Sequence, residues 1–440
     1  MSGRRWKRRR FLGHTAVVGL GTMGLPCVVP SSATGRDGAL PPSERIALAF
    51  IGPGGRGCNL IKAFGLRREV EILAVCDVRL ERRERALALA EQLAAQKNGG
   101  GRYRACRPYR DFRDVLALPE VDGVVLAACE HWRPTMCVMA AKAGKDVYTE
   151  KPLALTAGEA IAMARAIRRY GRIFQHGTQR RCEEYVRTAC EIVRSGRIGK
   201  VTHAVVPVGP GPRPAAPQGP PAPAPDPEVF DWDMWLGPAP WRPFGTLAGY
   251  WQHDADFGLR SIGNWGAHTL DMVQWALDKD EQTPVEIVPP CSSEEALALK
   301  YDDGLTIFCP RTPGDTIDAS VFGTEGQKII FGKPRIEERY DPTPLGPNDV
   351  RLYRAEKDPA FPRQWDDYYG NWLQCMRTRK KTICNEEVAY RSGMLCVLIA
   401  MADRLKRPFR YDPEKIQCPD DDEANRLLNT AKRAPWRATL

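Results

Sequence analysis

Ile46-Ala-Leu-Ala-Phe-Ile51 runs directly into Gly52-Pro-Gly-Gly-Arg-Gly57, and an apolar-periodic stretch follows. A second apolar run, residues 70–75, then ends in Cys76-Asp77. An apolar strand, a G-x-G-x-x-G turn that opens a helix, and an acidic residue about 20 positions further on make up the dinucleotide-binding fingerprint. The stretch therefore predicts the first strand, turn, helix and second strand of a Rossmann unit.

Each residue type in this fingerprint has a physical role. Gly52 permits the tight turn, Gly54 lets the backbone approach a pyrophosphate, and Gly57 allows the helix to pack closely on the strand. Free N–H groups at the helix N-terminus would hold the phosphates. Asp77 would accept hydrogen bonds from the ribose hydroxyls, and its charge would repel a 2′-phosphate. NAD is therefore the expected cofactor, in preference to NADP.

Two arginines leave the NADP alternative open. Arg56 lies inside the glycine-rich turn, and Arg79 follows Asp77 by two positions. If Asp77 points away from the ribose, either guanidinium could reach a 2′-phosphate.

The net charge gives little support to a nucleic-acid partner. The chain has 440 residues, 43% hydrophobic and 27% charged, with a formal net charge of +10, which fits a soluble protein of two domains. Six of the positive charges belong to one short N-terminal stretch: Arg4, Arg5, Lys7, Arg8, Arg9 and Arg10. Without them the excess is only +4, and no basic helix with groove-reading spacing follows.

The same basic stretch opens a segment, residues 1–36, with the features of an export signal. Arg8-Arg9-Arg10-Phe11-Leu12 fits the R-R-x-F-L pattern and resembles the signal of the Tat exporter. Residues 11–29 are too short and too Gly-rich for a stable membrane span. The Tat route carries folded proteins, so a cofactor could be loaded in the cytoplasm before transport to the periplasm. The alternative is a basic tail on a cytoplasmic enzyme.

Fourteen cysteines are scattered singly through the chain, many of them in apolar runs. No C-x-x-C pair and no Cys/His cluster of zinc spacing occurs. Most of them are expected to be buried small hydrophobes, so neither a structural metal nor a disulfide framework is predicted.

Strands and helices alternate through residues 43–175, which predicts an NAD-binding domain built on a doubly wound parallel sheet. The strands of such a sheet present their C-terminal ends to one crevice. Gly52, Asp77, Cys129 and Lys151 occupy those ends, so they are expected to face it together.

A second, α+β domain with an open, largely antiparallel sheet is predicted over residues 176–384. It contains a Pro-rich loop, residues 209–227, that is expected to lie on the surface. Residues 385–440 should form a helix and a tail that pack back on the body. Substrate specificity is expected to come from residues 232–251, where tryptophans cluster, and from the Pro-rich loop, although core packing is the more common fate of such tryptophans.

The chain from Arg45 onward resembles the glucose–fructose oxidoreductase, inositol dehydrogenase and MocA (Gfo/Idh/MocA) family, and in particular its members with Tat signals. The motifs that carry the resemblance are Gly52-Pro-Gly-Gly-Arg-Gly57, Cys76-Asp77, Ala141-Lys-Ala-Gly-Lys-Asp-Val-Tyr-Thr-Glu-Lys-Pro152, His176-Gly-Thr-Gln179, Ser195-Gly-Arg-Ile-Gly199, and Asn264-Trp-Gly-Ala-His268 with Asp271. Glu-Lys-Pro after a Rossmann strand is the most specific of them.

The resemblance implies a site. Lys151 would lie beside the nicotinamide and a substrate hydroxyl, and His268 would take the hydroxyl proton near neutral pH. Asp271, one turn further on, is expected to cap or pair within its own helix. The residues expected to contact the cofactor are Gly52, Gly54, Gly55, Arg56, Gly57, Asp77, Cys129, His131, Glu150 and Lys151. The open sheet would join copies into a dimer or tetramer, as in the family.

Two positions depart from the family pattern. Asn264 stands where the usual D-x-x-x-H pattern has an aspartate, so it can bond a sugar hydroxyl but cannot act as a base. Cys129-Glu-His-Trp-Arg133 replaces a more typical T-P-x-H or P-D-H-W-H run near the nicotinamide.

Three functions therefore stay open. The first is an NAD-dependent oxidoreductase that acts on a secondary hydroxyl of a sugar or polyol, with Lys151, His268 and Asn264 at the reacting group. The second is a glycosidase or epimerase that retains its NAD and runs a closed cycle of oxidation, elimination and reduction. The third is a catalytically weak NAD-binding sensor.

Overall fold

The computed structural model describes residues 40, 44–97, 106–214, 220–246, 250–292, 295–316, 318–325, 328–331, 346, 348–352 and 367–436. The predicted export signal, residues 1–36, lies outside these ranges. Residues 46–440 form one unit, and all the helices and strands named below belong to it.

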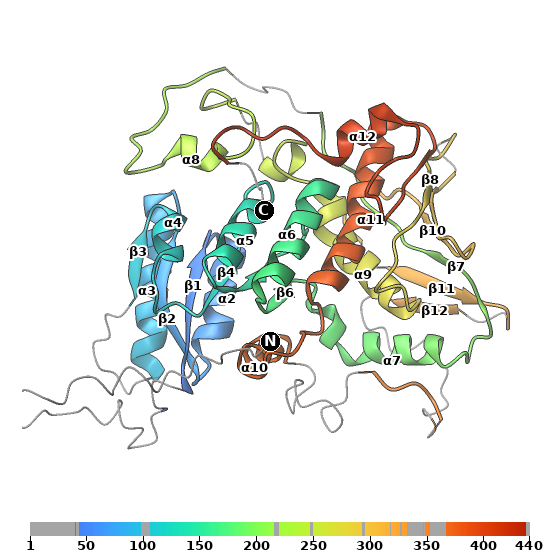
Figure 1. Ribbon diagram of the computed structural model, residues 1–440, viewed down its shortest axis with the longest axis horizontal. Helices are drawn as coiled ribbons and strands as arrows, with labels where there is room; N and C mark the ends of the chain where they lie inside the picture. Colours follow the sequence, from blue (N-terminus) through green and yellow to red (C-terminus); the bar gives the residue numbers. More distant parts are fainter. Residues whose placement is uncertain are drawn as a thin grey trace, which may run out of the picture. The chain divides into compact units, whose positions relative to one another are not determined.

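The N-terminal half is built on a six-stranded parallel sheet with strand order β3-β2-β1-β4-β5-β6 (Figure 1). Its strands are β1 (Ile46–Ile51), β2 (Val70–Cys76), β3 (Arg107–Tyr109), β4 (Gly123–Leu126), β5 (Asp146–Thr149) and β6 (Phe174–His176). The predicted Rossmann sheet is confirmed. β3 was not predicted, because its three residues include a proline and two that are exposed, so it shows no apolar run.

Helices connect these strands and cover the sheet. They are α2 (Gly55–Gly65), α3 (Leu80–Lys97), α4 (Phe112–Leu116), α5 (Arg133–Lys142) and α6 (Ala157–Tyr170). The strand order reverses at β1, so right-handed crossovers place α2 and α3 on one face and α5 and α6 on the other. The side chains of Thr156 and Glu159 cap the start of α6 reciprocally, and Gly171 at φ +60° ends it, as the sequence predicts.

The second sheet has seven strands in the order β12-β11-β7-β10-β9-β8-β13. Its strands are β7 (Val201–Val205), β8 (Glu286–Val288), β9 (Leu297–Lys300), β10 (Thr306–Cys309), β11 (Ala319–Gly323), β12 (Lys328–Phe331) and β13 (Phe409–Arg410). All pairs are antiparallel except β7 with β10, so the sheet is mixed but largely antiparallel, as predicted. The short strands β8 and β13 were not foreseen.

The remaining helices belong to the second half of the chain: α7 (Glu184–Arg194), α8 (Trp232–Leu236), α9 (Ala267–Ala276), α10 (Tyr368–Thr378), α11 (Glu386–Leu405) and α12 (Asp422–Leu428). α11 packs on α6 of the parallel-sheet half and on α9 of the other. Of the helices that the structure describes, none is long and apolar enough to cross a bilayer.

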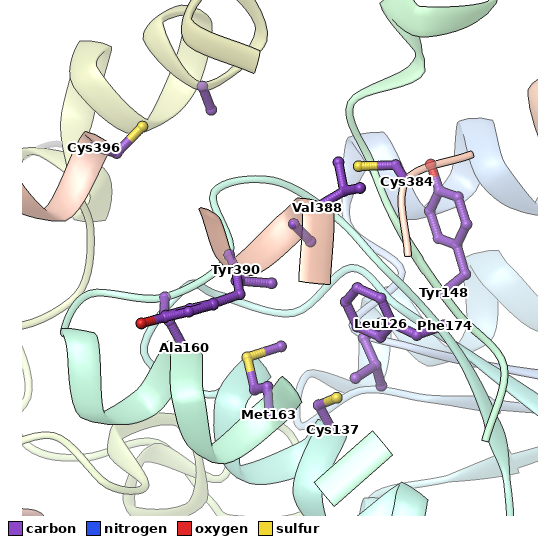
Figure 2. Packing of buried hydrophobic residues seen from close by; sticks show 14 of the residues in the cluster. Leu126, Cys137, Tyr148, Ala160, Met163, Phe174, Cys384, Val388, Tyr390 and Cys396 are labelled. Atoms are coloured by element: carbon purple, nitrogen blue, oxygen red, sulfur yellow. The ribbon is translucent and has the colours of Figure 1, made fainter. Parts of the chain in front are cut away.

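One hydrophobic core runs through both halves. Figure 2 shows buried side chains of β4, β5 and β6 near those of α5, α6 and the first turns of α11. Leu126, Tyr148 and Cys137 are fully buried in it, and Val388 and Tyr390 of α11 are buried as well. Helix α11 therefore contributes to the core of the parallel-sheet half.

The tryptophans after the Pro-rich loop have different environments. Trp232 and Trp235 are buried and stacked, with ring centroids 4.9 Å apart, in a second small cluster that includes Phe230 and Phe257. Trp241, in contrast, is 63% exposed. Core packing therefore accounts for two of the three.

Candidate active site

A cavity of about 600 Å³ lies at the C-terminal ends of β1, β2, β4 and β5. The residues that line it on the parallel-sheet side include Gly52, Gly54, Gly55, Arg56, Asp77, Arg82, Cys129, Arg133, Glu150 and Lys151. Those from the rest of the chain include Gln179, Trp235, Tyr250, Trp251, Gln252, Asn264, Trp265 and His268. The four strand ends expected to share one crevice do so.

The glycine-rich turn requires glycine at Gly52 and Gly57, because a side chain at either position would clash with the backbone. Gly52 adopts φ +77°, and a Cβ there would lie 2.4 Å from the Cα of Ala128 on the next strand end. A Cβ on Gly57 would lie 2.9 Å from the carbonyl oxygen of Gly52, so this glycine permits close packing behind the cavity. Gly55, at the N-terminus of α2, has open space where its Cβ would be. The turn thus leaves room for a phosphate against free helix N–H groups.

Asp77 lines the same cavity at the end of β2 and is 7% exposed. Its Oδ1 accepts a hydrogen bond from the backbone N–H of Arg79 at 2.9 Å, which holds the carboxylate at the strand end. Burial raises the pKa of this carboxyl, and that N–H together with the nearby arginines opposes the shift. A carboxylate in this position fits a ribose diol.

The two arginines that could favour NADP are engaged elsewhere. Arg56 donates to Glu150 Oε1 at 2.8 Å and to the Tyr369 hydroxyl at 3.1 Å. The guanidinium of Arg79 lies over the ring of Phe230, 3.8 Å from its centroid. Arg82 and Arg110, which the sequence did not single out, also line the cavity, and the charge of Arg82 acts on Asp77.

Lys151, two residues after β5, lines the same cavity, and β1 and β4 lie between its strand and β2, which ends next to Asp77. Its Nζ donates a hydrogen bond to the side-chain oxygen of Asn264. Burial lowers the pKa of Lys151, while the carboxylates of Glu150 and Glu130 oppose this shift. The ammonium has two further N–H donors, which can serve a substrate hydroxyl.

A single π-helical turn, Ile262–Gly266, leads into α9 and carries Asn264. His268 follows on the first turn of α9 and is 6% exposed. Burial holds its pKa well below the usual value, and the charge of Lys151 adds to the effect, so the imidazole is neutral near pH 7. Its Nδ1 has no hydrogen-bond partner among the described residues. Such turns concentrate at functional sites, because they redirect side chains within a helix.

The sequence predicts that Asp271 caps or pairs within its own helix. In the structure it pairs instead with a different segment of the chain. Both of its carboxylate oxygens accept hydrogen bonds from Arg181 at 2.8 Å. Arg181 is fully buried and also bonds Asp280 at 2.7 and 2.8 Å. The pair therefore fixes the 3₁₀ turn Gln179–Cys182 against α9, which carries His268.

Some residues of the unusual run 129–133 line the cavity, and others are buried behind its surface. Cys129 and Arg133 line the cavity, and His131 is not among its lining residues. His131 is buried against Trp235 and Phe257, its Nε2 lies 3.0 Å from the Trp235 carbonyl oxygen, and burial lowers its pKa to about 3. The position of His131 in the sequence does not indicate that its ring packs against Trp235 and Phe257.

Glu130 belongs to the same run and is fully buried. It accepts hydrogen bonds at 2.8 Å from the Gln252 side chain and from the Leu259 backbone N–H. Tyr250, Trp251 and Gln252 line the cavity as well. The described part of the Pro-rich loop instead lines a separate cavity of about 810 Å³ through Gly211, Pro212 and Pro214.

Nothing in the described residues brings three or more His, Cys, Asp or Glu side chains together as metal ligands. The residues present do fit a dinucleotide: a glycine turn at a helix N-terminus, an acid at the second strand end, and a lysine and a neutral histidine at the far end. NAD, when bound there, would accept a hydride from the substrate. The fold and the site thus define a nucleotide-binding α/β protein equipped to move a proton.

Comparisons with known proteins agree. Residues 46–178 match an oxidoreductase family with an NAD-binding Rossmann fold, and residues 220–438 match the C-terminal alpha/beta domain of the same oxidoreductase family. The chain belongs to the Gfo/Idh/MocA oxidoreductase family, and its N-terminal half is an NAD-binding domain.

Individual relatives are more distant. A glycosyl hydrolase family 109 protein of Solibacter usitatus is 28% identical over 208 residues, 44% of each chain. An inositol 2-dehydrogenase of Salmonella typhimurium is 30% identical over 151 residues, 33% of this chain and 41% of the relative. The chain thus spans less than half the length of these curated relatives.

Among solved structures, the WlbA dehydrogenase of Bordetella pertussis in complex with NADH and UDP-GlcNAcA has the same fold. It superposes with a TM-score of 0.57 at 18% identity, over 84% of this chain and 99% of that one.

Proposed function

We propose that this protein is an NAD-dependent oxidoreductase that acts on a secondary hydroxyl of a sugar or polyol. The observation that carries the proposal is the convergence of Lys151, Asn264 and His268 on the far end of a cavity whose near end is the glycine turn and Asp77. Similarity to an inositol 2-dehydrogenase supports the substrate class.

The side chains have complementary roles in this reaction. The neutral imidazole of His268 takes the hydroxyl proton, and the ammonium of Lys151 stabilises the oxygen as negative charge develops on it. Asn264 holds Lys151 in place and can also bond a neighbouring hydroxyl. The rings of Trp251 and Trp265, which line the same cavity, offer apolar surfaces for the sugar ring.

A glycosidase or epimerase that keeps its NAD is the second candidate, and similarity to glycosyl hydrolase family 109 proteins favours it. The test is whether substrate produces net NADH. Mature protein incubated with NAD⁺ and a panel of polyols and sugars should raise absorbance at the NADH wavelength if the first proposal holds. Conversion of a glycoside with no net NADH would establish the closed cycle instead.

We also propose that residues 1–36 direct export through the Tat route, because Arg8-Arg9-Arg10-Phe11-Leu12 fits its signal. A fusion of these residues to a reporter should reach the periplasm. The R8K/R9K variant should stay in the cytoplasm, and equal export of both fusions would refute the proposal.

A second copy of this chain is the proposed occupant of the outer face of the seven-stranded sheet. Phe308 of β10 and Ile330 of β12 are each 37% exposed there, and the rings of His203 and Phe322 stack between them on β7 and β11. Exposed apolar side chains on one face of a sheet are typical of protein interfaces. Sedimentation should show an oligomer that Phe308→Glu dissociates, and a monomeric wild-type protein would contradict the proposal.

A further inference from the structure

Asp315 lies behind Lys151, with the side chain of Asn264 between them. Lys151 Nζ donates to Asn264 Oδ1, and Asn264 Nδ2 donates to Asp315 Oδ2 at 3.1 Å. An ammonium has only donors and a carboxylate only acceptors, so the amide cannot be reversed without losing both bonds. The three side chains therefore form a relay, a chain of two hydrogen bonds that both donate in the direction from Lys151 to Asp315.

The relay joins distant parts of the chain. Lys151 follows β5 of the parallel sheet, Asn264 belongs to the π-helical turn before α9, and Asp315 lies between β10 and β11 of the second sheet. No sequence motif links Asp315 to the other two. Its charge also acts on His253: burial, Arg260 and Arg213 lower the pKa of that imidazole, and Asp315 opposes the shift.

We propose that Asp315 is a positioning residue that supplies Lys151, through the amide of Asn264, with the negative charge that the D-x-x-x-H pattern usually carries at position 264. The proposal rests on the role of Lys151 in the proposed function. A carboxylate that accepts from an amide N–H polarises the amide and strengthens its oxygen as an acceptor. Asp315 thereby favours the ammonium form of Lys151 and fixes its direction.

The other charges around Lys151 act on its pKa in opposite directions, so one more carboxylate shifts the balance between the ammonium and the neutral amine. Burial, Arg133 and Arg56 favour loss of the lysine proton, while Glu150 and Glu130 favour its retention. His268 and His176 lie close enough to sense the lysine charge and are themselves held neutral by burial. An additional carboxylate outside the cavity raises the population of the ammonium without occupying the space of the substrate.

The first test measures Lys151 itself and needs no turnover. Competitive acetylation of the purified full-length protein across pH, followed by mass spectrometry of the Lys151 peptide, gives the midpoint at which this amine loses its proton. D315N should lower the midpoint by about half a unit to one unit, as expected for a partly screened charge two hydrogen bonds away. D318N removes an exposed carboxylate from the same connection and should leave the midpoint unchanged.

Equal midpoints for D315N and D318N would overturn the proposal. A lowered midpoint in a protein without dehydrogenase activity would leave the relay standing and refute the proposed function, so the two failures are distinguishable.

The second test exchanges the two groups. N264D alone places two carboxylates within hydrogen-bond distance, so it should lower the melting temperature. The double variant N264D/D315N restores one carboxylate and one amide in exchanged positions and should recover most of the loss. D318N in the N264D background should recover none. If N264D and N264D/D315N melt at the same temperature, Asp315 is not coupled to position 264.

Discussion

Lys151 is the residue on which the proposed chemistry depends most. It is held by Asn264, surrounded by charges of both signs, and placed at the end of the cavity away from Asp77. Lys151→Met should reduce kcat/KM by about 10²- to 10⁴-fold, because the charge that stabilises the developing oxyanion is lost. NAD affinity, measured by fluorescence titration, should change little.

The matched control for this change is Lys62→Met, since Lys62 is exposed on α2 and does not line the cavity. Comparable activity in K151M and the wild-type protein would exclude a catalytic role for Lys151.

Asp77 should determine the choice between NAD and NADP. Asp77→Ser removes the acceptor for the ribose hydroxyls, which should weaken NAD binding by roughly ten- to a hundredfold, because hydrogen bonds to charged groups contribute about 1.5–3 kcal/mol. It also removes the repulsion of a 2′-phosphate beside Arg82. Titrations of both cofactors should therefore show NADP binding tightened. An unchanged ratio of the NAD and NADP dissociation constants in Asp77→Ser would mean that Asp77 does not contact the ribose.

The sequence identified the site residues that follow a strand directly. Gly52, Asp77 and Lys151 could be placed because the ends of parallel strands meet at one edge. Arg82, on the first turn of α3, and Asp315, in the connection between β10 and β11, could not, because no short motif marks either of them as a site residue. The direction of the His131 ring could not be foreseen either: its neighbours Cys129 and Arg133 line the cavity, but its own ring packs into the aromatic cluster.

At the scale of secondary structure, Arg181 determines how α9 sits against the turn before α7. It is a buried cation shared by Asp271 and Asp280. Arg181→Met should lower the free energy of unfolding by about 3–5 kcal/mol, because two acids then lose their partner in the interior. Urea denaturation measures the change.

Arg168 offers a control, since its ion pair with Glu387 lies on the surface and its side chain is 50% exposed. Arg168→Met should cost less than about 1 kcal/mol. Similar losses of unfolding free energy in R181M and R168M would show that burial of the Arg181 network adds no stability.

Strong periodic elements were predictable and weak ones were not. α6 carries a capping box and a terminal glycine, so both of its ends could be placed from sequence. The strands β8 and β13 have only three and two residues, too few to show alternation, and their pairing depends on segments more than 100 positions apart. The mixed character of the second sheet arises from one parallel pair, β7 with β10, which no local pattern specifies.

For the whole molecule, buried histidines predict a loss of stability in mild acid. Burial lowers the pKa of His131 and His176 to about 3 and that of His268 well below its usual value. The unfolded chain therefore takes up these protons first as the pH falls below about 6.5, and the folded state loses stability.

Each of these histidines should reduce the free energy of unfolding by about 1.4 kcal/mol per pH unit. Urea denaturation at pH 6.5 to 5, compared with His131→Asn, should show a shallower dependence in the variant. A wild-type stability that does not change over this range would contradict the burial of neutral histidines.

We propose that the protein uses NAD to oxidise a secondary hydroxyl of a sugar or polyol. The most direct measurement takes mature protein, assays the NAD released on denaturation, and follows NADH absorbance when polyols and sugars are added to the intact protein with NAD⁺. NAD binding and substrate-dependent NADH that is lost in K151M are the expected results. Protein that neither retains nor binds NAD, or that converts substrate with no net NADH, would contradict this proposal.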